Sequence, residues 1–112
     1  MERIDNNTAE ALRRFLALIA SRYDIAGAIL YGSRARGTHD QDSDADVAVL
    51  LNGEHRRRLP VKLDMAGSAF DVMLDTGVLI SPFPIWLDEW NSPEDFPNPR
   101  LLRNINQEGI RL

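Results

Sequence analysis

A glycine–serine pair, Gly32 and Ser33, has the residue types and the position needed to bind a phosphate group. The pair follows the short apolar run 28–31, which we interpret as a strand. Glycine adopts positive φ angles easily, so the pair predicts a sharp turn from this strand into a helix. The first N–H groups of that helix and the Ser33 hydroxyl would then face solvent, where they can donate to an anion.

Two aspartates, Asp44 and Asp46, stand at alternate positions where a second apolar run, 45–51, begins. Side chains two residues apart on a strand point to the same face and are separated by about 6.6 Å along the strand. Two carboxylates in this arrangement can converge on metal ions, and Mg²⁺ takes oxygen ligands. The pattern therefore predicts a metal site close to the phosphate-binding turn.

A third acid, Asp71, interrupts the apolar run 69–74, which we interpret as a further strand. An acid among apolar neighbours has no packing role there. If this strand lies beside the one that carries Asp44 and Asp46, Asp71 completes a three-acid cluster. The alternative, ordinary solvated acids without a metal, accounts for other aspartates of the 40–46 segment but leaves Asp71 unexplained.

These residues resemble the signature of the nucleotidyltransferase superfamily of the DNA polymerase beta type. That signature is Gly-Ser, ten residues, Asp-x-Asp and a third acid on a later strand, and Gly32, Ser33, Asp44, Asp46 and Asp71 match it. The resemblance implies that the Gly-Ser turn binds the phosphates of a nucleoside triphosphate. It also implies that the three aspartates are catalytic and hold Mg²⁺, with two ions expected, while a nucleoside monophosphate is transferred to a hydroxyl group.

Two further stretches narrow the resemblance to minimal nucleotidyltransferase (MNT) domains. They are Gly-Ser-Arg-Ala-Arg-Gly at 32–37 and the ending 106–112, in a chain that is short for the superfamily. Proteins of this kind are commonly antitoxins encoded beside a HEPN ribonuclease, and some transfer AMP from ATP to a tyrosine of that toxin. The resemblance implies the same activity here, and three intact acids would favour catalysis. The alternatives are an antitoxin that neutralises its toxin by binding alone, or an enzyme that modifies a small molecule.

The two arginines that follow the Gly-Ser pair could also serve the site. Arg36 could bind a phosphate group, or it could stabilise the turn through an ion pair with one of the nearby acids. Both roles are common for arginine, so both stay open. Arg34 is expected to be the more exposed of the two.

Three other phosphate or metal motifs fail on the same residues. Residues 32–37 have the glycine spacing of a P-loop, but the Lys-Ser or Lys-Thr that must follow is missing. Residues 40–51 begin like a calcium loop but lack the glycine at its sixth position and the glutamate at its twelfth. With no cysteine and two distant histidines, no zinc-binding set has the usual spacing.

Length and charge restrict the class of protein. We expect residues 1–112 to form a single domain. A net charge of -4 argues against a protein that binds nucleic acid by neutralising its backbone, although residues 56–58 are three arginines. No apolar run is long enough to cross a membrane, no secretory signal is recognised and there is no cysteine, so the expected location is the cytoplasm.

The remaining patterns predict an α/β fold. Apolar residues at helical spacing predict a first helix from about Thr8 to Arg22, capped by Asn7. A short helix is expected within 60–67, an edge strand or extended loop at 82–86, and a last helix within 98–109. We therefore expect a small mixed sheet of about three to five strands, with helices on one face and the acid cluster on the other face or the rim, as in the polymerase beta-like nucleotidyltransferase fold.

Overall fold

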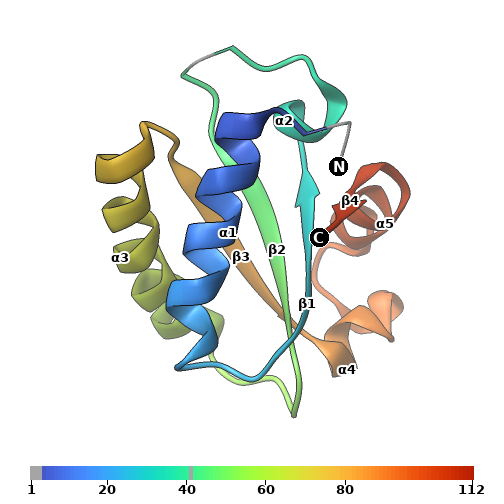
Figure 1. The fold of residues 1–112 in the computed structure, drawn as a ribbon. Coiled ribbons are helices and arrows are strands. Elements are labelled where there is room, and N and C mark those ends of the chain that lie inside the picture. The colour runs from blue at the N-terminus through green and yellow to red at the C-terminus, as the bar shows by residue number, and fades with distance from the viewer. Residues whose placement is uncertain (1–3, 41) are drawn as a thin grey trace.

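A four-stranded mixed sheet forms the centre of the computed structural model, which describes residues 4–40 and 42–112 (Figure 1). The strands are β1 (Ile25–Tyr31), β2 (Ala45–Leu51), β3 (Ile80–Trp86) and β4 (Ile110–Arg111). Their order in the sheet is β3-β2-β1-β4. β1 is antiparallel to β2 and to β4, whereas β2 and β3 are parallel. The predicted small mixed sheet of an α/β fold is confirmed.

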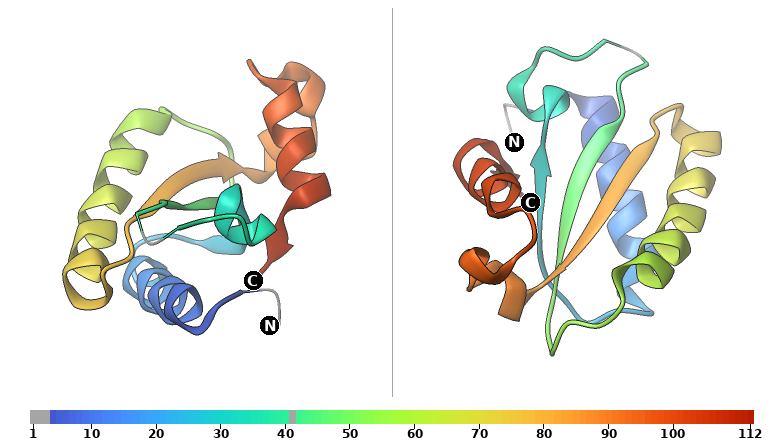
Figure 2. Two further views of the ribbon diagram at one scale, coloured as in Figure 1. Left: turned by 90° about the horizontal axis from the view of Figure 1, so that it is seen from above. Right: turned by 180° about the vertical axis from the view of Figure 1, so that it is seen from behind.

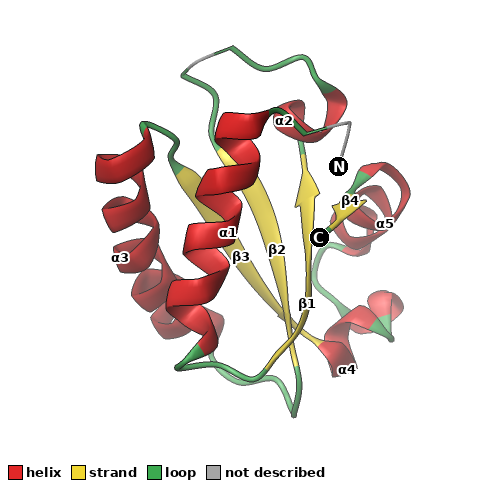
Figure 3. Ribbon diagram, viewed as in Figure 1, coloured by secondary structure: helices red, strands yellow, loops and turns green. Residues whose placement is uncertain are grey.

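Helices pack on both faces of the sheet. They are α1 (Asn6–Ala20), α2 (Ser33–Arg36), α3 (Arg58–Thr76), α4 (Leu87–Trp90), the 3-10 helix η1 (Pro93–Asp95) and α5 (Pro99–Glu108), shown in red in Figure 3. α1 and α3 cover one face, and α5 lies on the side of the sheet away from α1 (Figure 2). We expected helices on one face only. This is correct for α1 and α3 and wrong for α5, which packs on the other face. None of these helices, among the described residues, is long and apolar enough to cross a membrane.

The central strand β2 is buried on both faces, which explains why helices are needed on both. Val47 and Val49 pack with residues of α1 and α3, while the alternating Ala48 and Leu50 pack with residues of α5. Asp46, near the first residue of the strand, is only half-buried. The side chain of Asp46 therefore lies outside both apolar cores, although its neighbour Ala45 is buried.

The first helix forms where the periodicity predicts it, with a different cap. Its buried face includes Leu12, Phe15 and Ile19. The helix begins at Asn6 because Asp5 is the N-cap: its side-chain Oδ1 accepts a 2.7 Å hydrogen bond from the backbone N–H of Thr8. The prediction of Asn7 as the cap is wrong by two residues.

Helix α3 contradicts two sequence predictions at once. A short helix within 60–67 and a strand at 69–74 were expected, but residues 58–76 form one continuous helix. The buried side chains recur at helical spacing and are Val61, Met65, Ser68, Ala69 and Val72. The helix ends at Gly77, which has φ 79° and donates its N–H to the carbonyl of Met73. The apolar run 69–74 is thus split between the two sides of a helix.

The two C-terminal predictions are confirmed. Residues 82–86 belong to β3, which is an edge strand of the sheet, where prolines are tolerated because one side of the backbone makes no ladder bonds. In α5, the side chain of Asn98 accepts a 3.3 Å hydrogen bond from the Leu101 N–H, and Pro99 is the first helical residue. The helix ends just before Gly109.

Candidate functional site

The Gly-Ser pair forms the predicted sharp turn. β1 ends at Tyr31, Gly32 has φ 77° and ψ -157°, and α2 begins at Ser33. The backbone N–H groups of Ala35 and Arg36 donate to the Gly32 carbonyl at 3.1 Å, which closes the first helical turn. The N–H of Ser33 precedes those bonds, so it lies at the end of the helix that attracts anions. Binding of phosphate by Gly32 and Ser33 stays a prediction with a suitable geometry.

Asp46 lies directly against this turn. Tyr31 and Asp46 are partners in the antiparallel pairing of β1 and β2, which brings the acid next to the following glycine. A Cβ atom at Gly32 would overlap Oδ2 of Asp46. Glycine is therefore required here for its positive φ and also for the space that the carboxylate occupies.

Asp46 of β2 and Asp44, just before that strand, influence each other electrostatically. Burial raises the pKa of Asp46 above its usual value, the negative charge of Asp44 raises it further, and the positive charge of Arg36 lowers it. Asp44 is exposed, whereas Asp46 is half-buried. Two neighbouring carboxylates whose charges repel each other are stabilised by a cation placed between them.

A buried arginine holds the segment that leads to Asp44. Arg34 is 4% exposed, and its guanidinium donates to the Ser43 carbonyl at 2.9 Å and to Oγ1 of Thr8 at 2.7 Å. The expectation that Arg34 is exposed is wrong, because these bonds connect α2 to α1 and to the residue before Asp44. Arg34 is a positioning residue that sequence reasoning missed.

Comparison with known proteins identifies the family. The model of the family described as nucleotidyltransferase domain matches residues 12–106. This chain belongs to that family. Nucleotidyl transfer is the family's activity, and its members generally use a nucleoside triphosphate and a divalent metal ion. The Gly32 turn and the Asp44–Asp46 pair are the parts of this nucleotidyltransferase domain that suit such a substrate.

A solved structure confirms the fold. The crystal structure of a presumed nucleotidyltransferase from Sulfolobus solfataricus superposes with a TM-score of 0.55 at 15% sequence identity. The match covers 96% of this chain and 86% of the other. At that identity the similarity concerns the fold alone. No curated protein matches the chain in sequence.

Two carboxylates of the nucleotidyltransferase site fit the donor set of a divalent cation such as Mg²⁺. Mg²⁺ in nucleotide enzymes is commonly bound by one or two carboxylates together with the phosphates of the substrate. Asp44 and Asp46 supply two carboxylates, and the Gly32 turn next to them is suited to the phosphates. Within the described residues, no group of three His, Cys, Asp or Glu side chains could hold a metal ion. The expected number of two ions stays a prediction.

The third carboxylate predicted at Asp71 is not part of this site. Asp71 is exposed on α3, and α3 packs on the face of the sheet that carries Val47 rather than Asp46. Its spacing from Asp64 and Asp75 puts the three acids on one side of the helix. That side faces α1, because Arg22 pairs with Asp64 at 3.2 Å and Arg14 pairs with Asp75 at 3.6 Å. Asp71 is therefore a surface residue of a helix, which is why its apolar neighbours in sequence gave a misleading signal.

The strand that does lie beside β2 carries no acid. In the parallel pairing of β2 and β3, Asp46 is opposite Ser81 and Ala48 is opposite Phe83. These two residues of β3 stand where a third carboxylate could reach the pair, and the seven residues of β3 include no acid. Ser81 was missed because the short apolar run 78–80 before it was not recognised as the start of a strand.

Arg36 forms a weak ion pair with an acid of α5, whereas any ion pair was expected with one of the acids near the turn. Its Nη1 lies 3.7 Å from Oε2 of Glu108 in α5, and both side chains are about half exposed. Exposed pairs of this length contribute little to stability. The Arg36 charge also lowers the pKa of Asp46, and phosphate binding by Arg36 stays a prediction.

Tyr31 is a second residue that sequence reasoning missed. It ends β1 on the face that carries Asp46, and burial together with the Asp46 charge raises its pKa to about 12. The phenol therefore keeps its proton at neutral pH and can donate a hydrogen bond. The signal in the sequence was a hydroxyl-bearing aromatic residue directly before the Gly-Ser pair.

A groove of about 440 Å³ extends from Asp44 between β3 and α3. Its polar lining includes Asp44, Lys62 and Ser81, and its apolar lining includes Leu59 and Leu63. Grooves of several hundred Å³ are large enough for a ligand. This groove is the open space next to the acid pair.

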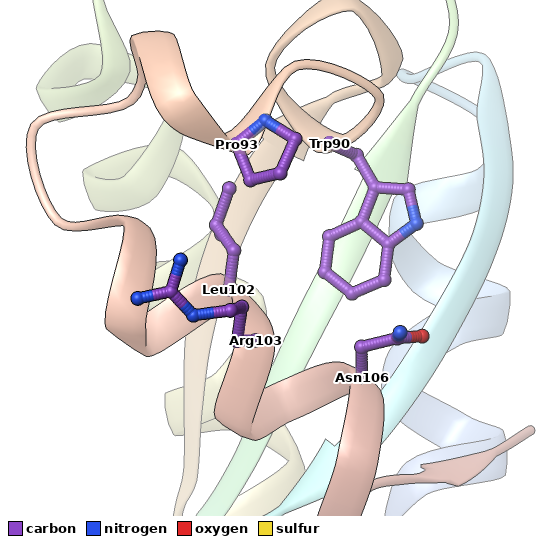
Figure 4. A pocket seen from close by; sticks show the side chains of 5 residues that line it. All are labelled: Trp90, Pro93, Leu102, Arg103 and Asn106. Atoms are coloured by element: carbon purple, nitrogen blue, oxygen red, sulfur yellow. The ribbon is translucent and has the colours of Figure 1, made fainter.

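A smaller cavity, of about 110 Å³, lies between the helices on the other side of the sheet (Figure 4). The side chains that line it are Trp90, Pro93, Leu102, Arg103 and Asn106. None of these residues comes from the segment 32–46, and the volume is below that of typical ligand pockets. We assign this cavity no part in the reaction.

Proposed function

We propose that this nucleotidyltransferase domain transfers AMP from ATP to a hydroxyl group of a partner protein, a HEPN-type toxin, and thereby acts as its antitoxin. The observation that carries the proposal is the contact between Gly32 and Asp46. It places a carboxylate beside a turn whose geometry suits phosphate groups. The choice of ATP and of the toxin rests on the resemblance to MNT domains.

The chain's own residues would act mainly by binding and orienting the nucleotide. The Gly32–Ser33 turn would hold the β- and γ-phosphates, and Asp44 and Asp46 would hold Mg²⁺. When bound, Mg²⁺ supplies positive charge that neutralises the phosphate oxygens. The acceptor oxygen would form a bond to the α-phosphorus, the bond to the bridging oxygen would break, and pyrophosphate would leave.

Removal of the acceptor's proton is the weak step of this mechanism. Asp71 does not lie at the site, and Ser81 and Phe83 occupy the nearby positions of β3. The proton would therefore pass to solvent. A positioned general base contributes about 10² to 10⁴ in rate, so we expect transfer to be slower by about this factor than with a third carboxylate.

A second candidate function is an antitoxin that binds its toxin and a nucleotide with little or no catalysis. The absence of an acid on β3 favours it. Three intact acids would have favoured catalysis, but β3 does not supply the third. The small-molecule alternative gains no support from these residues.

Label transfer separates the two candidates. The protein is incubated with ATP labelled at the α-phosphate, Mg²⁺ and the toxin encoded beside it. The double variant Asp44→Ala, Asp46→Ala tests the acid pair, and Asp71→Asn is the matched control because that acid is exposed on α3. Label on the toxin that survives in Asp71→Asn and vanishes in the double variant supports transfer. A toxin that is bound and silenced without label supports the second candidate.

A further inference from the structure

The outer side of α3 carries an apolar stripe whose side chains are all more than half exposed in a single copy. The stripe consists of large side chains with exposed fractions of 61%, 62%, 53% and 66%, at Leu59, Leu63, Phe70 and Leu74. Successive residues of the stripe are separated by four, seven and four positions, so all four side chains lie on one side of the helix. The side chains that α3 buries against the sheet are a separate set. Isolated exposed leucines are ordinary, but a continuous stripe indicates an interaction surface.

The stripe is symmetric about its own midpoint, between Ala66 and Gly67. Leu59 and Leu74 lie equally far from that midpoint in sequence, and so do Leu63 and Phe70. A twofold interface between identical chains requires a surface that is complementary to itself. An apolar pattern that reads the same from both ends meets this requirement for two antiparallel helices.

Gly67 gives an independent reason to expect another helix at this place. It lies in the interior of α3, it is exposed, and a Cβ atom there would meet no other atom within 4 Å. Nothing within one copy therefore requires a glycine, although glycine destabilises a helix interior relative to alanine. Small residues at a crossing point allow two helices to approach closely.

We propose that α3 packs antiparallel against α3 of a second copy of this chain, about a twofold axis between Ala66 and Gly67. Leu59 then contacts the partner's Leu74, and Leu63 contacts the partner's Phe70. The edge strand β3 lies on the same side of the molecule, but it is a poor place for a strand of a second copy to pair. Pro82 and Pro84 lack the N–H groups that such pairing requires.

The size and charge of the surface predict a weak dimer. The stripe is about 24 Å long, and a helix face of that length is smaller than the roughly 800 Å² per partner of a standard stable interface. Each copy also carries a net charge of -4. In a twofold antiparallel pair the acidic side of α3, with Asp64 and Asp71, comes near the same side of the partner. We therefore expect dissociation in the micromolar range and tighter association at higher salt concentration.

The dimer would also border the site. Leu59 and Leu63 of the stripe, together with the neighbouring Ala66, line the groove that reaches Asp44. A second copy would then form a wall of that groove. The association itself does not depend on the proposed transfer of AMP.

Sedimentation equilibrium from low micromolar to several hundred micromolar protein tests the association. We expect the wild type to form dimers within this range, and Leu63→Asp or Phe70→Asp to raise the dissociation constant at least tenfold. Leu18→Asp is the matched control, because Leu18 is an apolar residue of α1 with 43% exposure outside the stripe. Circular dichroism checks that each variant folds. A wild type that stays monomeric throughout overturns the proposal, even if these variants weaken binding of a toxin.

Disulfide crosslinking tests the antiparallel register. The chain has no cysteine of its own, so only the introduced cysteines can form disulfides. Gly67→Cys lies next to the twofold axis and should crosslink two copies upon oxidation. Mixed copies of Leu59→Cys and Leu74→Cys should crosslink to each other, whereas Leu59→Cys alone should not. Efficient crosslinking of Leu59→Cys to itself would indicate a parallel pair and contradict the proposed arrangement.

Discussion

The carboxylate of Asp46 occupies the space that a side chain at Gly32 would need. Gly32 follows the strand β1, whose last residue pairs with the start of β2, and its backbone angles of φ 77° and ψ -157° are almost exclusive to glycine. One residue thus allows both the turn of the chain and the approach of the acid. The turn proposed to bind phosphate and the acid proposed to bind a metal ion therefore form a single structural unit.

This relationship predicts a large effect of Gly32→Ala. The added methyl group meets a forbidden backbone region and the Asp46 carboxylate, so we expect a loss of about 1–3 kcal/mol in the free energy of unfolding. Binding of ATP with Mg²⁺ should be lost as well. Urea unfolding and calorimetric titration measure the two effects.

Gly37→Ala is the matched control for that substitution. Gly37 also has a positive φ, of 76°, but a Cβ atom there would meet nothing within 4 Å. We expect a smaller loss of stability and unchanged nucleotide binding. Equal effects of the two substitutions would mean that contact with Asp46 adds nothing to the requirement for glycine.

Ser81→Asp should increase nucleotidyl transfer. Ser81 is opposite Asp46 on the neighbouring strand, so an aspartate there would give β3 the third carboxylate that it lacks. We expect transfer to rise by up to about 10² to 10⁴, the usual contribution of a general base. The same variant should be less stable without Mg²⁺, because a third negative charge is added to the pair.

Ser81→Asn controls for the shape of that side chain, since it lacks the negative charge. Label transfer from ATP and thermal unfolding with and without Mg²⁺ are the measurements. A Ser81→Asp variant no more active than Ser81→Asn would show that this position of β3 does not contribute to the reaction.

The ion pair between Arg58 and Glu89 should contribute strongly to stability. Their Nη2 and Oε2 atoms lie 2.6 Å apart, and the side chains are 23% and 12% exposed. The guanidinium also lies over the rings of Phe83 and Phe96. Arg58→Met leaves a largely buried carboxylate without its cation, so we expect a loss of about 2–3 kcal/mol.

Arg57→Met is the comparison for Arg58→Met, because it removes an exposed arginine from the preceding position. Its effect should stay within about 0.5 kcal/mol, as is usual for surface substitutions. Urea unfolding of both variants checks this. Equal effects would show that the ion pair and the ring contacts add no net stability.

The pKa of His55 should be raised by Asp88. Its Nδ1 lies 2.7 Å from Oδ2 of Asp88, and this hydrogen bond is the main cause of the raised pKa. The pKa of His55 is higher in the folded state than its value of about 6.5 in the unfolded state. The hydrogen bond to Asp88 therefore contributes its full stabilisation at a pH below about 6.5. The contribution is lost as the pH rises through the pKa of the folded state.

An NMR titration of the His55 ring protons measures this pKa directly. We expect a midpoint above 6.5 in the wild type and a lower midpoint in Asp88→Asn. The pH dependence of unfolding should weaken in the same variant. An unchanged midpoint in Asp88→Asn would show that the hydrogen bond is not kept in solution.

Much of the site could be predicted from the sequence because its determinants are local. A glycine–serine pair after an apolar run specifies a turn, and alternate aspartates at the start of a strand specify a shared face, whatever the rest of the chain does. The family signature depends on the same local spacing, and the match to the nucleotidyltransferase family confirms the family, while the roles of these residues stay predictions. Gly32, Ser33, Asp44 and Asp46 could therefore be named in advance.

Asp71 shows where such local reasoning fails. A run of six mostly apolar residues fits a buried strand and also fits part of an amphipathic helix, and periodicity over so short a length does not separate them. The helix forms because Val61, Met65 and Val72 extend its buried face over a longer stretch. The sequence signature then assigned a metal ligand to a position on the outside of that helix.

The sequence by itself determined the Gly32–Ser33 turn, the positions of the two aspartates and the family, since each depends on residues close together in the chain. Only the tertiary structure decided which side chains surround that pair: Ser81 opposite Asp46, Arg34 buried behind Asp44, and Asp71 outside the site. The physical reason is that strand pairing and helix packing bring together residues far apart in sequence. Their partners are selected by burial of apolar surface across the whole domain rather than by any local pattern.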